Sequence, residues 1–257
     1  VSYGIDPREI EDYIKSCITK HIIIKKDKGY VYQKNIGFKN IDYDSKYVIF
    51  IDDDVEIQPG TIRILVSILE KFEDIGLAQP LLVTKDHKID SIGAYLDYLG
   101  YSYMPLRGKD LNEIRSGNIL YKVTYVASCV ILRTEIFKGS PLLPYDSFYF
   151  FNYEDVDLAL RTWLIGYKVV CIPFVIAIHE RGRTALLKNA PPKFVYLNTR
   201  NRLITLLSLL NLSLILKYIP LNLLFEILRA TVLFNKNPSH SIAIIHAILW
   251  IFKNIRY

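Results

Sequence analysis

Three consecutive carboxylates follow a short apolar run at residues 47–51. The segment reads YVIFIDDDVEIQPGTI, so Asp52, Asp53 and Asp54 come directly after five mostly apolar residues. Three adjacent carboxylates do not all stay ionised cheaply unless a cation joins them. Oxygen ligands favour Mg²⁺ or Mn²⁺, which proteins often hold with one or two carboxylates and substrate phosphates. The cluster therefore predicts a divalent metal site for a phosphate-bearing substrate; the alternative is a solvated turn whose Asp caps the next helix.

A second pair of carboxylates, Glu154 and Asp155, follows the aromatic run SFYFFNY at residues 147–153. Carboxylates at the start of a helix are favoured by the helix dipole and by free N–H groups, so capping alone is one explanation. Two adjacent acids, with Asp157 a further helical step on, exceed what one cap needs. A carboxylate beside an aromatic-lined pocket suits a general base for a hydroxyl acceptor. Asp157 and Arg161, four residues apart, are expected to form a structural ion pair.

His179 ends the apolar run VIAIH at residues 175–179. A single His is commonly structural, but this one ends a predicted strand of the same sheet as the Asp cluster. Ligands of parallel α/β sheets bind outside the carboxyl ends of the strands. His179 is therefore either a further metal ligand or a structural residue.

These residues need elements that position them. Short β-rich runs alternate with helical patterns through the first two-thirds of the chain, which predicts an α/β fold with a Rossmann-like mixed, mostly parallel sheet flanked by helices. Strands are expected at residues 1–4, 21–26, 47–51, 75–83, 168–173 and 175–179, and a strand leading into a short helix within 123–137. Helices are expected at residues 6–17, 58–74 and 154–167. Residues 86–125, rich in Tyr and Gly, are expected to form a hairpin and an acceptor-side loop.

From about Pro191 the chain becomes apolar and helical. Of the 32 basic and 26 acidic residues, seven basic and one acidic lie from Arg200 onward, which leaves 25 of each before it. The net charge of +6 thus belongs to the most apolar part of the chain, a combination typical of surfaces that meet anionic lipid. The alternative is a hydrophobic helical subdomain with basic ends. Nucleic-acid binders more often carry their basic residues among polar ones, so we expect no nucleic-acid partner.

Residues 203–225 contain one charged residue, Lys217. A membrane span needs roughly 20 apolar residues. We expect Pro220 to split this stretch and residues 241–252 to be too short to cross, so the helices are predicted to lie in the membrane interface. The alternative is a single crossing by residues 203–225. The chain then divides into a catalytic domain over residues 1–190 and an apolar, basic, membrane-associating region over residues 191–257.

Three cysteines, Cys17, Cys129 and Cys171, have no CxxC spacing. They argue against a disulfide framework or a zinc site and fit a reducing compartment. The opening VSYGID has no signal-peptide pattern and is typical of the middle of a domain. A first strand and helix are therefore expected to precede residue 1.

Together, three features resemble the family 2 glycosyltransferases with the GT-A fold: IDDDV at residues 51–55, FFNYEDVDLALRTWLIGYKV at 150–169, and a strand that ends in His179. Further similarities are NIGFKN at residues 35–40, YVASCVILRTEIF at 125–137 and YLNTRNRL at 196–203. The resemblance covers roughly residues 1–205. The family's first strand, which holds the nucleotide base, is absent, and SYGID stands where members often have an Asp-rich segment. Recognition of the nucleotide base is therefore the function that the resemblance supports least.

The resemblance implies roles for residues at matching positions. Asp52 and Asp54 match the metal-binding Asp-x-Asp motif, and His179 matches a histidine that binds metal in some members. Asp155 matches the catalytic base, and Glu154 its neighbour that helps to bind the acceptor. Contacts to the nucleotide sugar are expected from Asp53, Asn35 and Gly37, and support of the acceptor or of the structure from Arg200, Asn201, Asp157 and Arg161.

The implied protein is an inverting glycosyltransferase of the hexosyl or deoxyhexosyl class that uses a nucleotide-diphosphate sugar and Mg²⁺ or Mn²⁺. Its acceptor is expected to be a glycan or a lipid-linked glycan at the cytoplasmic face of a membrane, to which the chain binds peripherally or monotopically. The C-terminal helices are alternatively a surface for homo-oligomers. Two other classes stay open: a metal-dependent nucleotidyl or phosphoryl transferase, and a non-catalytic protein that binds sugar nucleotides or membranes.

Overall fold

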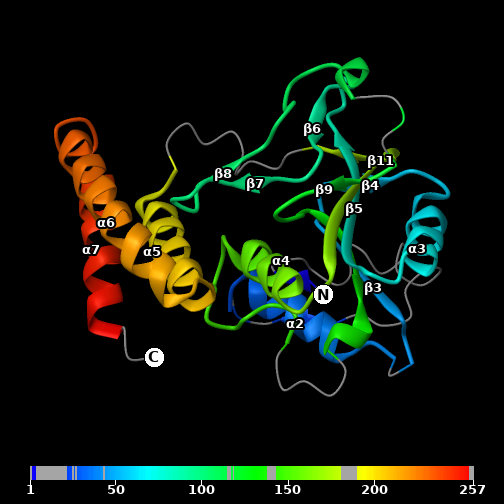
Figure 1. The fold of residues 1–257 in the computed structure, drawn as a ribbon, viewed down its shortest axis with the longest axis horizontal. Coiled ribbons are helices and arrows are strands. Elements are labelled where there is room, and N and C mark those ends of the chain that lie inside the picture. Colours follow the sequence, from blue (N-terminus) through cyan, green and yellow to red (C-terminus); the bar gives the residue numbers. More distant parts are fainter. Residues whose placement is uncertain are drawn as a thin grey trace.

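A seven-stranded mixed sheet forms the centre of the computed structural model (Figure 1). The structure describes residues 22–24, 26, 28–42, 44–114, 117, 119–137, 143–180 and 190–254, and the backbone of residues 2 and 3. The main strand order is β3 (Tyr47–Ile51), β10 (Cys129–Arg133), β5 (Ile75–Val83), β11 (Lys168–His179) and β4 (Val55–Ile57). Two short strands extend it, because β6 (Ile89–Ser91) pairs with β5 and β9 (Tyr121–Lys122) with β11.

Three strands of this sheet run in the same direction. β11 is parallel to β5, and β10 is antiparallel to both β5 and β3, so β3 points the same way as β5 and β11. The carboxyl ends of β3 and β11 therefore meet at one edge of the sheet. Asp52 follows the first of these strands and His179 ends the second. The predicted mixed α/β fold is confirmed.

Helices cover both faces of the sheet (Figure 1). α3 (Thr61–Lys71) packs Leu65 and Leu69 against Ile75 and Ile131 on one face. On the other face, α2 (Tyr30–Lys39) and α4 (Glu154–Leu164) join a second buried cluster around Leu77 of β5. Every residue of β5 is buried, as expected for a strand covered on both faces.

Several predicted elements are confirmed and others are corrected. Strands at residues 47–51 and 75–83 form with the predicted bounds. The two strands predicted at residues 168–173 and 175–179 are one strand, β11, with a register shift between Ile172 and Ile176. An irregularity at this place accommodates Pro173, which cannot donate a ladder hydrogen bond. Helix α2 was not among the predicted elements.

Shorter elements complete the first part of the described chain. β1 (Ser2–Tyr3) pairs in parallel with β2 (Ile23–Ile24), which confirms strands at these two places. β7 (Tyr95–Leu96) and β8 (Ser102–Tyr103) form the predicted hairpin. Two 3₁₀ helices, η1 and η2, cover Leu111–Glu113 and Thr134–Phe137. The helix predicted at residues 6–17 and Cys17 lie outside the described residues.

Three long helices end the described chain: α5 (Pro192–Leu209), α6 (Leu212–Phe234) and α7 (Pro238–Asn254). They lie together beside the sheet (Figure 1) and share a buried cluster around Ala230 and Ile244. The break expected at Pro220 is wrong, because Pro220 lies inside α6. The chain turns instead at Leu210, and the side chain of Asn211 caps α6 by accepting a hydrogen bond from the amide of Leu214.

None of the helices within the described ranges is long and apolar enough to cross a membrane. The division into domains at residues 190 and 191 stays a prediction.

Candidate active site

Asp52, at the carboxyl end of β3, faces helix α2. The hydroxyl group of Tyr30 donates a hydrogen bond to its Oδ1, and its backbone amide donates to the carbonyl oxygen of Ser128 at 2.8 Å. Burial raises the pKa of Asp52, and the positive charge of Lys34 opposes this rise. The first carboxylate of the cluster is therefore directed into the protein, towards α2.

Lys34 of α2 lies beside the predicted base. Its Nζ atom is 3.0 Å from Oδ1 of Asp155, and its side chain is only 8% exposed. The same Nζ lies 4.2 Å from the ring centroid of Tyr30 and 4.4 Å from that of Tyr145. Burial opposes the charge of Lys34, but nearby acidic groups, Asp155 first, raise its pKa well above the usual range. Lys34 is therefore a fixed cation at this end of the site.

Glu154 is the first residue of α4 and is 3% exposed. Burial, and next the charge of Asp155, raise its pKa from the ordinary value of 4.5 to about 7. Its Oε2 atom has no hydrogen-bond partner among the described residues. The chain enters α4 through Asn152 and Tyr153, which both have positive φ angles, 66° and 68°. This strained turn aims the two acids into the site.

The raised pKa of Glu154 predicts a pH-dependent stability. A carboxyl group with a higher pKa in the folded chain stabilises the fold below its ordinary pKa, and that stabilisation is lost as the pH rises through the folded value near 7. Glu154→Gln does not ionise, so between pH 5 and pH 8 its thermal midpoint should fall less than that of the parent. Over this pH range, the free energy of unfolding of the parent should fall by up to about 3 kcal/mol more than that of Glu154→Gln. A control, Glu73→Gln on the surface, should follow the parent, and equal slopes for all three proteins would contradict the prediction.

Asp54 and His179 form a second group at the same sheet edge. Nε2 of His179 is 3.3 Å from Oδ1 of Asp54, and Nδ1 is 2.6 Å from Oδ2 of Asp90 on β6. The side chain of Asp90 is only 4% exposed, so its carboxylate is positioned to accept the Nδ1 proton and to leave Nε2 as the ligand atom. A metal-binding histidine commonly donates its second N–H to a carboxylate in this manner.

These contacts test whether the residues fit a divalent cation. Within the part of the chain that the structure describes, no three His, Cys, Asp or Glu side chains are grouped to hold a metal by themselves. Asp54 and His179 supply two donor atoms, and hard cations commonly complete such a pair with substrate phosphates and water. The pair and the orienting Asp90 therefore fit the metal.

The structure divides the carboxylate cluster. Lys34 and Tyr30 face Asp52, His179 faces Asp54, and Asp53 is exposed. The expectation that a single cation joins all three carboxylates is therefore too simple, because the protein itself supplies partners for two of them. The role of Asp52 as a metal ligand stays a prediction.

Two residues predicted to contact the nucleotide sugar lie on α2. Asn35 is buried; its Nδ2 donates to the carbonyl oxygen of Tyr145 at 2.6 Å, and its Oδ1 accepts from the amide of Tyr145 at 3.3 Å. This exchange fixes the loop before the aromatic run. Gly37 lines a cavity of about 310 Å³ between α2 and β3, which Lys34 also lines. Contact of Asn35, Gly37 and Asp53 with a nucleotide sugar stays a prediction.

The remaining predicted residues hold the segment that leads into α4. The expected ion pair forms, with Nη2 of Arg161 2.7 Å from Oδ2 of Asp157, and Arg161 also donates to the carbonyl oxygen of Pro144 at 2.6 Å. Asn201 donates to the carbonyl oxygens of Phe151 and Asn152 at 2.8 and 2.7 Å. Arg200 donates to the side-chain oxygen of Asn201. In this structure the four side chains act as supports.

Sequence reasoning missed Tyr30, Lys34, Asp90 and Tyr145. Lys34 directly precedes NIGFKN, one of the segments that resemble the family, so the resemblance pointed to the neighbouring Asn35. Its partner Asp155, however, lies 121 residues away. Asp90 stands in the short run IDS within residues 86–125, which were expected to form a hairpin and a loop, and nothing in the local sequence distinguishes it.

Comparison with known proteins gives two kinds of match. Residues 6–133 match the family model described as "Glycosyl transferase family 2". No curated protein matches the chain.

Solved structures share the fold. The structure of GalNAc-T7 with UDP, GalNAc and Mn²⁺ has a TM-score of 0.57 and 16% identity, over 77% of this chain and 38% of that one. TarS 1–349 of S. aureus in complex with UDP-GlcNAc has a TM-score of 0.50 and 14% identity, over 83% and 59%. The mannosyltransferase PcManGT from Pyrobaculum calidifontis, in complex with GDP-Man and Mn²⁺, has a TM-score of 0.50 and 10% identity, over 95% of this chain and 62% of that one. The alignments thus cover 38 to 62% of the lengths of these relatives.

Proposed function

Because residues 6–133 match the model of glycosyl transferase family 2, we propose that the chain moves a sugar from a nucleotide-diphosphate donor to a hydroxyl acceptor, with inversion at the anomeric carbon. One observation carries the proposal: the base and the metal pair lie at the same sheet edge. Asp155 lies 3.0 Å from the buried cation Lys34, whose charge also acts on Asp52. Two residues further on, Asp54 faces His179. One end of the site suits proton removal and the other suits a diphosphate with its cation.

In the proposed step, the carboxylate of Asp155 removes the proton of the acceptor hydroxyl. The acceptor oxygen forms a bond to the anomeric carbon from the face opposite the leaving group. The bond from that carbon to the diphosphate oxygen breaks, and the nucleoside diphosphate leaves with the electron pair. Lys34, 3.0 Å from Asp155, orients the carboxylate before the step. Glu154, with a pKa of about 7, is positioned to exchange hydrogen bonds with the acceptor in either protonation state.

Asp54 and His179 would hold a divalent cation, Mg²⁺ or Mn²⁺, with Asp90 orienting His179. When bound, the cation would neutralise the charge that grows on the leaving diphosphate. Two of the similar structures are complexes with Mn²⁺, which supports a divalent cation.

A thermal-shift panel tests donor binding. UDP-, GDP- and dTDP-linked hexoses and deoxyhexoses are added to the chain with and without Mn²⁺. We expect at least one donor to raise the thermal midpoint when Mn²⁺ is present and to do less without it. A panel in which no donor shifts the midpoint would argue against a nucleotide-sugar site.

Lys34 is expected to set the pH range of the reaction. Lys34→Met removes the cation that lowers the pKa of Asp52 and Glu154, so the acidic limb of the kcat/KM profile should move to higher pH. The loss at pH 6 should reach about tenfold or more, since about 1.4 kcal/mol of lost charge stabilisation has this effect. Lys34→Arg keeps the charge and should restore part of the activity. A profile that falls equally at every pH would mean that Lys34 acts only in packing.

We further propose that the outer surface of α6 and α7, here called the apolar tail face, binds the membrane that carries the sugar acceptor. Its large apolar side chains are at least 38% exposed: Leu212, Leu216, Leu221, Leu224, Phe225, Ile227, Leu228, Val232, Phe234, Ile242, Ile245, Leu249 and Phe252. Large exposed apolar surfaces are typical of interaction sites, and these side chains lie on two helices that pack against each other. A lipid-linked or membrane-proximal glycan acceptor is consistent with such a face.

The positive charge on this surface is smaller than the sequence count suggests. Arg202 and Arg229 both pair with Glu226 inside the helices, and the hydroxyl of Tyr101 donates to the same carboxylate. Lys217, Lys236 and Lys253 are exposed among the described tail residues. Each contributes roughly 1 kcal/mol near an anionic leaflet before screening by salt, so apolar contact should dominate binding.

Liposome flotation tests the apolar tail face. Leu249→Ser combined with Phe252→Ser should reduce flotation with anionic vesicles, because it removes two side chains worth about 2 kcal/mol each when buried. Ile62→Ser with Ile64→Ser on α3 changes two exposed apolar residues elsewhere and should float like the parent. High salt should weaken binding only in part. A parent chain that ignores vesicles and forms oligomers would make this face a subunit interface instead.

A further inference from the structure

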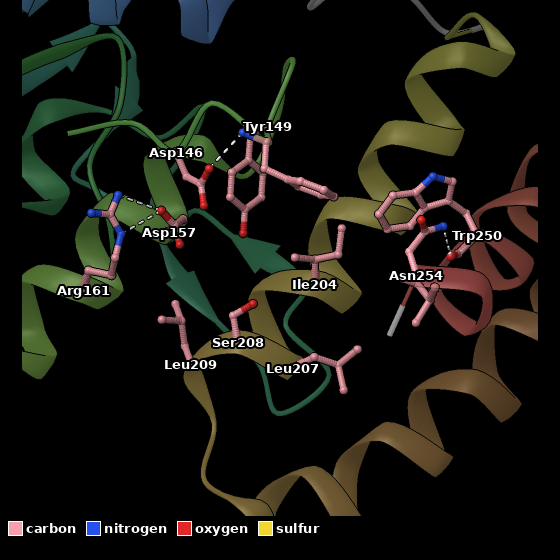
Figure 2. Close-up of a pocket in the computed structure, with 12 residues that line it drawn as sticks. Asp146, Tyr149, Asp157, Arg161, Ile204, Leu207, Ser208, Leu209, Trp250 and Asn254 are labelled. Atoms are coloured by element: carbon pink, nitrogen blue, oxygen red, sulfur yellow. Dashed lines mark hydrogen bonds and ion pairs between the residues drawn. The ribbon is translucent and has the colours of Figure 1, made fainter. Parts of the chain in front are cut away.

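A second cavity, drawn in Figure 2, does not have Asp155 among its lining residues. Its volume is about 640 Å³, and it lies between the loop at residues 146–149 and helices α4, α5 and α7. No step of the proposed reaction uses it. Volumes of this size are typical of small-molecule sites.

Its walls combine aromatic faces with polar edges. Phe148 and Trp250 meet with ring centroids 5.3 Å apart, and Arg200 stacks over both rings, at 5.1 and 5.4 Å. Around the aromatic pair, Figure 2 shows polar groups from three elements: Asp146 of the loop, Ser208 of α5 and Asn254 of α7. Ile204 and Leu207 form an apolar floor.

The charged groups around the cavity balance. Asp146 and Asp157 stand against two cations: Arg161, whose guanidinium group is already bonded to Asp157 and to the carbonyl oxygen of Pro144, and Arg200 on the aromatic pair. The cavity therefore presents no net charge to a ligand. Hydroxyl groups can donate hydrogen bonds to the carboxylates, so a neutral ligand rich in hydroxyl groups matches the lining.

We propose that this cavity binds an uncharged oligosaccharide. A sugar ring presents C–H faces, which pack on aromatic and aliphatic side chains, and hydroxyl edges, which need donors and acceptors at the rim. The cavity offers both, and its balanced charge suits a neutral ligand. The inference rests on the proposed function and deepens it. The loop at residues 146–149 continues through residue 153 to Glu154 and Asp155, so the cavity would hold a part of the acceptor glycan remote from the reacting hydroxyl.

Binding of neutral tetrasaccharides, measured without donor or metal, tests the proposal. The probes are maltotetraose, cellotetraose, mannotetraose and chitotetraose, followed by saturation-transfer NMR and titration. Ser208→Trp fills the cavity from an exposed position on α5, and Ser67→Trp on α3 is the matched exposed control. We expect at least one probe to bind the parent and the control, and its affinity to fall by about tenfold or more in Ser208→Trp. Asp146→Asn, which keeps the shape of the loop, should weaken it as well.

The outcomes separate the two proposals. If no probe binds the parent, or if Ser208→Trp and Asp146→Asn bind as the parent does, the assignment is wrong. Laurate that binds in place of the sugars and is excluded by Ser208→Trp would make the cavity a lipid pocket. Donor hydrolysis should continue in Ser208→Trp, because the reacting groups are untouched. A parent that binds tetrasaccharides but never turns over a donor would refute the proposed reaction and leave the cavity site standing.

Discussion

Asp155→Asn is expected to reduce sugar transfer by about a thousandfold or more, in line with the loss of a general base. Asn keeps the shape of the side chain, and its carbonyl oxygen can still accept a hydrogen bond from Lys34. Donor and metal affinities should therefore change little, while kcat falls, because only removal of the acceptor proton is lost. Single-turnover assays and calorimetry with the donor measure the two effects separately.

A matched control is Asp74→Asn. Asp74 directly precedes β5, and its half-exposed carboxylate pairs with Lys168. It should keep the parental rate. An Asp155→Asn variant that retained more than about a tenth of the parental kcat would refute the assignment of the base, since that corresponds to less than about 1.4 kcal/mol in the barrier.

Asp54→Asn is expected to weaken Mn²⁺ binding by roughly a hundredfold or more. Loss of a residue that only orients a ligand commonly costs roughly 10- to 100-fold in affinity, and the loss of a charged ligand should cost at least as much. Activity at a fixed Mn²⁺ concentration should fall by orders of magnitude while the fold stays intact. Calorimetric titration of Mn²⁺ into the variant measures the affinity.

Asp53→Asn is the control for this titration, because Asp53 is the exposed neighbour of the same cluster. Its Mn²⁺ affinity without donor should match that of the parent. Equal Mn²⁺ affinities for the parent and Asp54→Asn would show that the cation binds elsewhere or not at all.

The sequence predicted the parts of the fold that rest on apolar periodicity. The apolar runs at residues 47–51 and 75–83 became β3 and β5, and the mixed sheet placed Asp52 and His179 at one edge as expected. Helix α2 was missed because its apolar residues do not follow one face and it contains Gly37. Buried strands are specified by local composition, whereas this helix is held by contacts such as Asn35 with Tyr145.

The site was predicted less completely, because its partners come from distant segments. The charge of Lys34 is not informative until α2 packs beside α4, and the role of Asp90 depends on the pairing of β6 with β5. In the tail, counting charges overestimated the basic surface, because Arg202 and Arg229 turn inward to Glu226. Local sequence predicts which side chains are charged, but tertiary packing decides which of them reach solvent.

The most direct test of the central claim is the fate of the donor. The chain is incubated with Mn²⁺ and each nucleotide sugar that shifts its thermal midpoint, with water or a neutral oligosaccharide as acceptor, and the products are followed by ³¹P and ¹H NMR. We predict release of a nucleoside diphosphate and a first-formed sugar product of inverted anomeric configuration. Release of pyrophosphate, or a product that retains the donor's configuration, would contradict the proposed inverting transfer.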